Sequence, residues 1–488
     1  MNRYILFFIL LTVFSCSAKE NNDVSEKFVS NSTIEVNSSL KSDMVIQQNS
    51  TFVIKGKGTA GEKVRVTCSW AASPVITTVD NNSSWSVSVT TPGAAMEPVN
   101  IIVEGKIKKT FSNILVGEVW ICAGQSNMQW YLKNAANGTE EVATATYPKI
   151  RLLNISRRTA VTPQEEFDAQ WLPCVPSTAG DFSAVGYFFG KKLFNELNTP
   201  IGLISVNWGN TAIEVWMNSQ WVNGDAELLD DAFTRSAGHD DGSPSTVGSA
   251  YNAMIHPLNG IPVAGVIWYQ GENNQGSPYI YPKFLKTMIE GWRNDWQKQF
   301  PFYICQIAPY KRLWNYKTYY SNPAMRFSQA EATKTIAKTA IEVNDDIADI
   351  NDIHPRNKKD VGLRLASLAL SQTYGKTTFN TLRSPIYKEM SVVGNKIIIR
   401  FNFAETGFKT MDGNLPSLFE ICGDDKVFYA ANAKISGSEI ELTSPDVSAP
   451  VAARMGWSYT KVTNLRTTEN LPVSVFKTYQ WADITEEK

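Results

Sequence analysis

Histidine is scarce in this chain of 488 residues, which has only His239, His256 and His354. With so few histidines and no His-Glu-x-x-His motif, a zinc site is not expected. An excess of charge of one sign is also missing, because 46 Lys and Arg offset 47 Asp and Glu to a net charge of −1. A chain without a basic excess lacks the mark of a nucleic-acid-binding protein. We therefore expect no metal or other cofactor and no nucleic-acid partner.

Cysteine is sparse as well, with six residues in the whole sequence. Cys16 lies close to the N-terminus, which leaves an odd number in the rest of the chain, and no two of these have the spacing of metal ligands. A full disulfide framework is therefore excluded, whereas one or two bridges stay open. The remaining cysteines are Cys68, Cys122, Cys174, Cys305 and Cys422.

Near the N-terminus an apolar run of eleven residues, 4–14, follows the positive charge of Arg3. Eleven residues are too few to span a bilayer as a helix, and the pattern is typical of a signal peptide. The run leads into a small residue followed by Cys16, which resembles the bacterial lipobox. We expect a signal peptide over residues 1–16 with lipidation of Cys16. Cleavage of a plain secretory signal near Ala18 is the alternative.

Residues 17–38 are rich in Asn, Ser and Glu, and this composition predicts a flexible tether. The four residues after the lipobox cysteine resemble the short charged tag of surface lipoproteins in Bacteroidetes-type bacteria. We therefore expect an exported protein, periplasmic or on the cell surface of a Gram-negative bacterium. Its contact with the membrane is expected only through the lipid anchor.

The length predicts about three domains, and a composition of 43% hydrophobic and 19% charged residues is that of a globular protein. Residues 39–113 and 385–482 both show short alternating runs between turns, which predict an N-terminal and a C-terminal β-sandwich-like domain. Examples of these runs are residues 51–54, 63–68, 75–79, 85–89, 99–103, 386–393, 396–403 and 439–443.

Residues 114–378 follow a different pattern, in which continuous apolar strands alternate with amphipathic helices. Continuous apolar strands of this kind predict a parallel sheet covered by helices on both faces, hence the α/β class. The predicted strands are 118–122, 201–206, 263–268 and 302–307, and the predicted helices are 185–198, 281–297, 322–337 and 357–373.

Polar residues follow these strands at the sheet edge where open α/β sheets bind ligands. Ser126 follows the first strand in a Gly-containing turn, as a nucleophile on a strand-to-helix turn would, although it could equally be the N-cap of a helix. Gly209 follows the second strand and could present a backbone N–H. After the third strand, Gln270 is a candidate side-chain donor and Glu272 a candidate partner for other site groups.

A serine nucleophile needs a base, and the base needs an acceptor that orients it. His354 is the one histidine with acids closely upstream, Asp349 and Asp352, at the expected mouth of the α/β layer. His239 lies in a Gly-Asp loop. His256 lies among apolar residues, which favours a structural role.

Three of these segments together resemble the conserved blocks of the SGNH-hydrolase superfamily. They are Gly-Gln-Ser-Asn-Met at 124–128, Trp-Tyr-Gln-Gly-Glu at 268–272 and Asn-Asp-Ile-His-Pro at 351–355. From about residue 40 to 480 the chain more closely resembles bacterial sialate O-acetylesterases and related acetyl carbohydrate esterases. The resemblance implies a flavodoxin-like α/β/α layer with accessory β-domains.

The resemblance also implies a metal-free reaction in which Ser126 attacks an acetyl carbonyl and His354 takes and returns the proton. The oxyanion hole would be formed by the backbone N–H groups of Ser126 and Gly209 and by the Gln270 side chain, where superfamily members often use Asn. Supporting roles fall to three further residues of the same blocks, Gln125, Asn127 and Glu272.

The acid of the triad departs from the superfamily pattern. The spacing typical of the superfamily places it at position 351, which is Asn351 in this chain. Asp352 is favoured, because residues two apart in an extended segment point the same way, and Asp349 is the second candidate. A Ser–His dyad with a neutral acceptor also stays open.

The implied substrate is an O-acetylated glycan, in first place 9-O-acetylated sialic acid. An acetyl esterase acting on xylan or xyloglucan is the alternative within the same class. An alternative of another class is a catalytically inactive, glycan-binding surface lipoprotein. Trp216, Tyr269 and Trp457 are candidate sugar platforms, with core packing as the competing interpretation, and the sequence makes no prediction of the oligomeric state.

Overall fold

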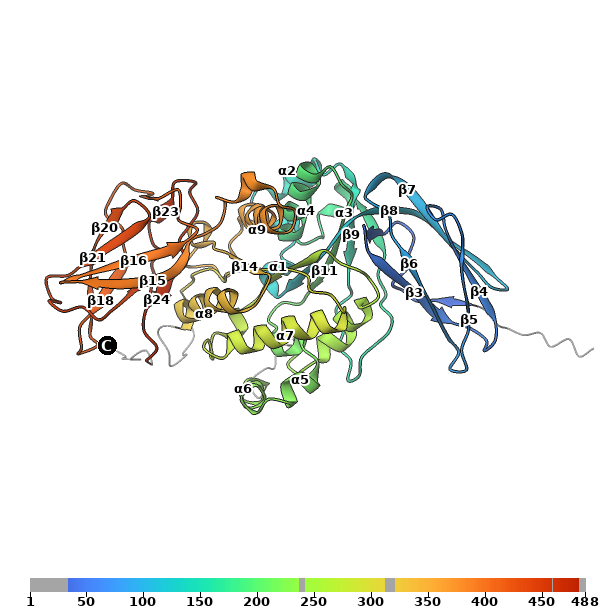
Figure 1. Ribbon diagram of the computed structural model, residues 1–488, viewed down its shortest axis with the longest axis horizontal. Helices are drawn as coiled ribbons and strands as arrows, with labels where there is room; N and C mark the ends of the chain where they lie inside the picture. Colours follow the sequence, from blue (N-terminus) through green and yellow to red (C-terminus); the bar gives the residue numbers. More distant parts are fainter. Residues whose placement is uncertain (1–33, 237–241, 312–320, 459, 482–488) are drawn as a thin grey trace, which may run out of the picture.

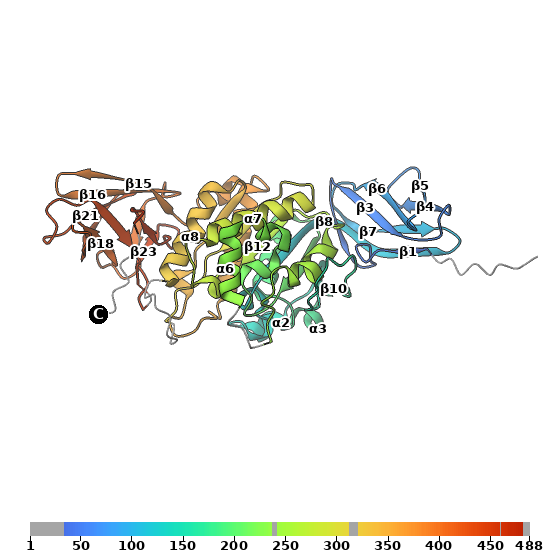
Figure 2. The same cartoon turned by 90° about the horizontal axis from the view of Figure 1, so that it is seen from below.

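The computed structural model describes residues 34–236, 242–311, 321–458 and 460–481 as three bodies in a row (Figures 1 and 2). A β-domain lies at each end, and a mixed α/β layer lies between them. The predicted signal peptide, Cys16 and most of the tether fall outside the described residues, as does His239. Within the described ranges no helix is both long enough and apolar enough to cross a membrane.

The middle layer is built on a sheet with the strand order β10-β9-β11-β8-β12-β13-β14. From β9 to β14 neighbouring strands are parallel, and only the edge strand β10 is antiparallel. The carboxyl ends of β8, β11 and β12 therefore meet at one edge. The strands are β8 (Lys108–Gly124), β9 (Tyr147–Asn154), β10 (Trp171–Cys174), β11 (Ile201–Asn207), β12 (Gly265–Tyr269), β13 (Phe302–Cys305) and β14 (Thr339–Glu342).

Helices cover both faces of this sheet, and the strand residues alternate between two cores. In β8, Ile121 packs in the core that contains α7, whereas Trp120 and Cys122 pack in the core that contains α4 and α9. This alternation follows from the period of two along a strand. Helices α4 (Ala184–Leu197) and α9 (Lys358–Gln372) pack on each other on one face, and α7 (Tyr281–Asp295) and α8 (Ser321–Thr335) do so on the other.

Of the other α-helices in the described residues, all but α6 have six residues or fewer. They are α1 (Ser126–Gln129), α2 (Gly138–Ala143), α3 (Pro176–Ala179), α5 (Ser219–Asn223) and α6 (Ala226–Ser236). In the middle layer the four predicted helices and the strands 201–206, 263–268 and 302–307 lie within a few residues of α4, α7, α8, α9, β11, β12 and β13. The strand predicted at 118–122 is the end of the much longer β8, and β9, β10 and β14 were not predicted. The predicted α/β class is thus found.

The N-terminal β-domain shares its longest strand with the middle layer. β8 pairs with β7 and β2 in its first half and with β11 and β12 in its second half. The boundary predicted at 113/114 therefore falls inside one continuous strand. The other strands of this domain are β1 (Glu35–Val36), β2 (Val45–Gln47), β3 (Thr51–Lys57), β4 (Lys63–Cys68), β5 (Val75–Thr78), β6 (Ser84–Thr90) and β7 (Ala95–Glu104).

The C-terminal β-domain holds three small antiparallel sheets, β15-β16-β21-β20, β19-β18-β22-β24 and β17-β23, around a core of its own. All five cysteines outside the N-terminal segment are buried and unpaired, so none of the bridges left open by the sequence forms between them. The strands are β15 (Ile386–Val393), β16 (Lys396–Asn402), β17 (Phe408–Thr410), β18 (Phe419–Cys422), β19 (Phe428–Ala430), β20 (Asn432–Ser436), β21 (Glu439–Thr443), β22 (Ala452–Met455), β23 (Leu465–Thr467) and β24 (Phe476–Lys477).

Candidate active site

Ser126 lies just beyond the carboxyl end of β8, where a tight turn leads into α1. The turn requires glycine at position 124, because its φ is 144° and a Cβ there would lie 2.1 Å from the carbonyl oxygen of Tyr269. The N-cap of α1 is Gln125, so Ser126 is the first helical residue and not the cap. The Ser126 hydroxyl is thus free of a capping role.

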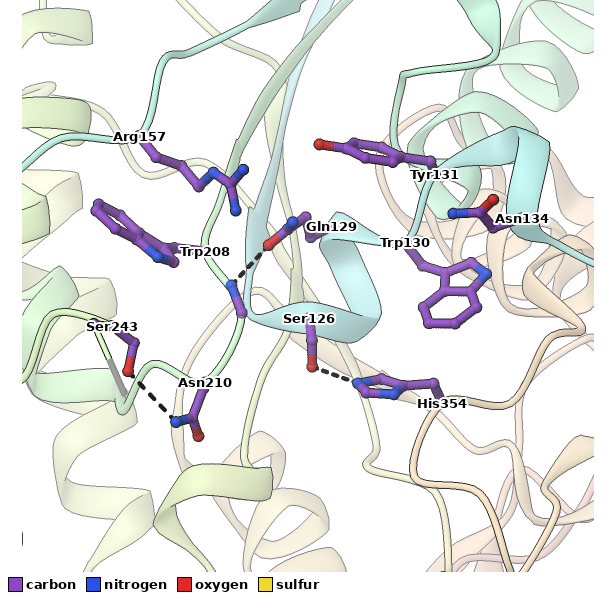
Figure 3. A pocket seen from close by; sticks show the side chains of 12 residues that line it. Ser126, Gln129, Trp130, Tyr131, Asn134, Arg157, Trp208, Asn210, Ser243 and His354 are labelled. Atoms are coloured by element: carbon purple, nitrogen blue, oxygen red, sulfur yellow. Dashed lines mark hydrogen bonds between the residues drawn. The ribbon is translucent and has the colours of Figure 1, made fainter. Parts of the chain in front are cut away.

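His354 lies in the loop before α9, and its Nε2 is 2.9 Å from Ser126 Oγ (Figure 3). Its imidazole stacks on the indole of Trp130, with ring centroids 5.2 Å apart and an interplanar angle of 25°. Burial lowers the pKa of His354 below its usual value, and the nearby positive charge of Lys358 lowers it further, while Asp352 acts in the opposite direction. A neutral imidazole hydrogen-bonded to a serine hydroxyl is the arrangement that general-base catalysis requires.

The two candidate acids both shape the loop that carries His354. Asp352 Oδ1 accepts a hydrogen bond of 2.8 Å from the backbone N–H of His354, and Asp349 Oδ1 accepts one of 2.9 Å from the backbone N–H of Asn351. Among the residues that the structure describes, neither carboxylate forms a hydrogen bond with the imidazole ring. Asp352 is nevertheless close enough for its charge to raise the pKa of His354.

Gly209 lies beside Ser126, since a Cβ at that position would be 3.4 Å from Ser126 Cβ. Its backbone N–H donates a hydrogen bond of 2.8 Å to Gln129 Oε1 (Figure 3). The N–H of Ser126, at the start of α1, has no partner within its helix. The Gly209 N–H thus lies near the Ser126 side chain, with Gln129 as its partner.

Gln270 is a correction to the sequence prediction, because its side chain does not reach this site. It is fully buried, and Nε2 donates to the carbonyl oxygen of Thr211 at 3.1 Å and to Asn274 Oδ1 at 2.6 Å. Its Oε1 accepts a 2.9 Å hydrogen bond from the Tyr281 hydroxyl. The amide is therefore committed to internal contacts, and the side-chain amides that do line the site belong to Gln129, Asn134 and Asn210.

The three residues expected in supporting roles do connect the blocks of the site. Gln125 Oε1 accepts from the backbone N–H groups of Gly271 and Asn273, at 3.4 and 3.3 Å. Asn127 Nδ2 donates to Glu272 Oε1 at 2.6 Å and to the carbonyl oxygen of Ile353 at 3.0 Å. The serine turn is thereby tied both to the loop after β12 and to the histidine loop.

A cavity of about 420 Å³ opens over Ser126 and His354, within the size range of small-molecule sites. Three aromatic residues line it, Trp130, Tyr131 and Trp208, together with the guanidinium of Arg157 (Figure 3). Within the described part of the chain, no cluster of three or more His, Cys, Asp or Glu side chains is placed to hold a metal ion. The cavity thus joins a Ser–His pair to a surface suited to a sugar.

Comparison with known proteins agrees with this geometry. Residues 116–371 match the family model described as carbohydrate esterase, sialic acid-specific acetylesterase. The chain belongs to this family. It is accordingly an enzyme, a carbohydrate O-acetylesterase.

Two curated relatives and one solved structure show how far the similarity extends. The sialate O-acetylesterase of Homo sapiens is 28% identical over 465 residues, 86% of each chain. That of Rattus norvegicus is 28% identical over 420 residues, 74% of this chain and 77% of the relative. The crystal structure of a carbohydrate acetylesterase from Xanthomonas citri superposes with a TM-score of 0.83 at 31% identity, and covers 92% of this chain and all of that one.

Sequence reasoning missed several residues of the esterase site. Trp216 and Tyr269 are fully buried and Trp457 is 5% exposed, so the aromatic residues proposed as sugar platforms belong to the core. Trp130 and Tyr131, which do line the cavity, follow the Ser126 turn directly in sequence, and that proximity could have indicated them. Trp208 directly precedes Gly209 and could have been indicated in the same way, whereas Arg157 carries no comparable local signal.

Proposed function

We propose that this carbohydrate O-acetylesterase removes acetyl groups from sialic acid, in first place from its 9-O position. The observation that carries the chemistry is the 2.9 Å contact between Ser126 Oγ and His354 Nε2 on the wall of the cavity. We further infer that the middle layer is an SGNH-hydrolase layer, because the serine, glycine and histidine segments follow three strands of one sheet, β8, β11 and β14, at the same edge.

In the proposed reaction, Ser126 Oγ attacks the acetyl carbonyl carbon while His354 Nε2 accepts the hydroxyl proton. The carbonyl oxygen becomes an oxyanion, which the N–H groups of Ser126 and Gly209 stabilise once Gln129 has moved away. His354 then returns the proton to the ester oxygen of the sugar, the bond between that oxygen and the acetyl carbon breaks, and the sugar leaves with a free hydroxyl while an acetyl-serine remains. A water molecule, activated by the same imidazole, releases acetate and restores the serine.

The charge of the cavity favours an acidic sugar over a neutral one. Among the described residues that line it, Arg157 carries the one permanent charge, and no carboxylate is present. Its guanidinium forms no hydrogen bond or ion pair within the described part of the chain, and it lies between Trp208 and Tyr131 (Figure 3). A free guanidinium matches the carboxylate of sialic acid, which the xylose backbone of xylan lacks.

The experiment that tests this substrate compares acetate release from 9-O-acetyl sialic acid and from acetylated xylo-oligosaccharide. We expect wild-type kcat/KM to be higher on the sialate. Arg157→Gln should lower kcat/KM on the sialate by about ten- to a hundredfold, the value of one charge-assisted hydrogen bond, mainly through KM. On 4-nitrophenyl acetate, which has no carboxylate, the same variant should stay within about twofold of wild type.

Arg157→Lys is the matched control, since it keeps the charge and should recover part of the lost affinity. A wild-type preference for the xylo-oligosaccharide would replace the sialate assignment by the polysaccharide alternative. An equal effect of Arg157→Gln on all three substrates would show that the guanidinium does not recognise the sialate carboxylate. A glycan-binding protein without activity is already at odds with membership of an esterase family.

The roles of the two aspartates can be separated by charge-removing variants. Asp352→Asn keeps the acceptor for the His354 backbone N–H but removes the charge that stabilises the imidazolium. We expect kcat to fall by less than the roughly 10⁴-fold seen where an aspartate bonds the ring itself. Because the Asp352 charge raises the pKa of His354, its removal should lower that pKa. The acid limb of the pH profile, where kcat/KM declines as the pH falls, should therefore move to lower pH.

Asp349→Asn should have a smaller effect on kcat and leave the acid limb in place, because its bond is to the backbone of Asn351. Both variants are measured on a small acetyl ester over pH 4–9. A larger loss for Asp349→Asn than for Asp352→Asn would reverse the assignment of the acid.

A further inference from the structure

Lys358, the first residue of α9, is a buried lysine at a helix N-terminus, and both its burial and its position are unfavourable for a positive charge. Its side chain is fully buried, although lysine is almost never fully buried without a partner. It also places a positive charge in the first turn of a helix, where the helix dipole favours negative charge. A residue that violates two local preferences at once often does so for function.

The partner of Lys358 is the residue next to the nucleophile. The Lys358 ammonium donates a hydrogen bond to Asn127 Oδ1, and the amide nitrogen of Asn127 donates one to Glu272 Oε1. Glu272 is 6% exposed, and its other carboxylate oxygen is buried without a hydrogen-bond partner. Asn127 therefore bridges a buried cation and a buried carboxylate directly beneath the Ser126 turn.

Asn127 and Lys358 each also contact the histidine loop or the ring that packs on it. Asn127 Nδ2 also donates to the carbonyl oxygen of Ile353, the residue before His354. The Lys358 ammonium lies 5.8 Å from the ring centroid of Trp130, the indole on which the His354 imidazole stacks. The ring of Tyr269, at the end of β12, contacts the ammonium from another side at 5.4 Å.

We propose that Lys358 is a positioning residue of this esterase: through Asn127 and Trp130 it fixes the serine turn against the histidine loop, and it places a positive charge beside the indole on which the imidazole stacks. The inference rests on the proposed role of His354 as general base. It adds to that role a cation that acts from behind the site and does not touch substrate.

The electrostatic part of the proposal has a defined sign. The Lys358 charge lowers the pKa of His354 beyond the effect of burial, and Asp352 is the charged group that opposes it. The pKa of Lys358 itself is lowered to about 8 by burial, against the opposing effects of Cys305, Glu272, Asp352 and Glu342. The ammonium is therefore mostly charged at neutral pH, and its removal should raise the pKa of His354.

The test is the pH dependence of kcat/KM for Lys358→Met on a small acetyl ester. We expect kcat to fall by about ten- to a hundredfold, as for a displaced catalytic base, and the acid limb to move upward by on the order of one pH unit. Lys359→Met is the matched control, because Lys359 is the next residue of the same helix and is exposed. It should match wild type in both rate and pH profile.

Lys358→Arg preserves the charge, so its acid limb should stay at the wild-type pH even if kcat falls. If Lys358→Met does not fold, the double variant Lys358→Met/Glu272→Gln removes the carboxylate that would be left unpaired, and it should show the same upward shift. Folding of each variant is checked by circular dichroism and thermal melting.

Either of two results would overturn the inference: a lower kcat with an unmoved acid limb, or wild-type behaviour of Lys358→Met. Ser126→Ala, measured in parallel, separates this failure from that of the proposed mechanism. An inactive Ser126→Ala with an unshifted Lys358→Met removes only the role of Lys358, whereas an active Ser126→Ala removes the serine mechanism as a whole.

Discussion

Ser126→Ala is expected to lower kcat by at least about three orders of magnitude while the fold stays intact. The hydroxyl is the attacking group in the proposed reaction, and without it only binding and the backbone N–H groups can assist hydrolysis. The variant should cost little stability, because Ser126 does not cap α1 and its side-chain hydrogen bond is to His354. Acetate release and a thermal melt measure the two effects.

Ser243→Ala is a suitable control, since Ser243 lines the same cavity and the change removes a similar hydroxyl (Figure 3). It should stay within a few-fold of wild type. A fluorophosphonate probe should label the wild type and Ser243→Ala but not Ser126→Ala. Labelling of Ser126→Ala, or activity within tenfold of wild type, would place the nucleophile elsewhere.

His354→Asn should lower kcat by about 10³- to 10⁴-fold, since the serine then loses the base that accepts its proton. The base works only when neutral, so wild-type activity should decline on the acid side as His354 becomes protonated. Because burial and Lys358 lower its pKa, that decline should come below the usual pKa of histidine. The acid limb should be absent from the residual activity of His354→Asn.

His256→Asn serves as the control for loss of an imidazole. His256 Nδ1 lies 2.9 Å from the carbonyl oxygen of Gln164, and its ring packs against Tyr251, so its contacts are structural. We expect this variant to lower the melting temperature and to keep its kcat and its acid limb. A His354→Asn variant with a wild-type pH profile would show that another group titrates in the reaction.

The sequence by itself determined the elements that carry strong periodicity. Helix 185–198 was predicted and α4 is Ala184–Leu197, and strand 201–206 was predicted and β11 is Ile201–Asn207. Buried parallel strands are continuous apolar runs and the covering helices are amphipathic, so both leave a local pattern. The edge strand β10, only four residues long, leaves a much weaker one.

The positions of Ser126 and Gly209 at the sheet edge could also be predicted, because each follows a strand that the sequence marks, and parallel strands bring their carboxyl ends to one edge. His354 could be placed there because acids lie just before it and a marked helix begins just after it. Their mutual distance, and which aspartate serves the histidine, depend on the loop between β14 and α9. Within that loop the Asp352 carboxylate bonds to backbone, a geometry that residue spacing does not encode.

Tertiary structure alone decided which polar side chains reach the cavity. Gln270 follows a buried strand, as a site residue would, but Thr211, Asn274 and Tyr281 satisfy its amide in the interior. Lys358 looks like an ordinary helix residue in sequence, yet packing buries it beneath the nucleophile on Asn127, 231 positions away. Buried polar groups must find partners, and those partners come from distant segments. The motifs of the sequence therefore named Asn127 and Glu272, whereas the contact of Asn127 with Lys358 is set by the tertiary structure alone.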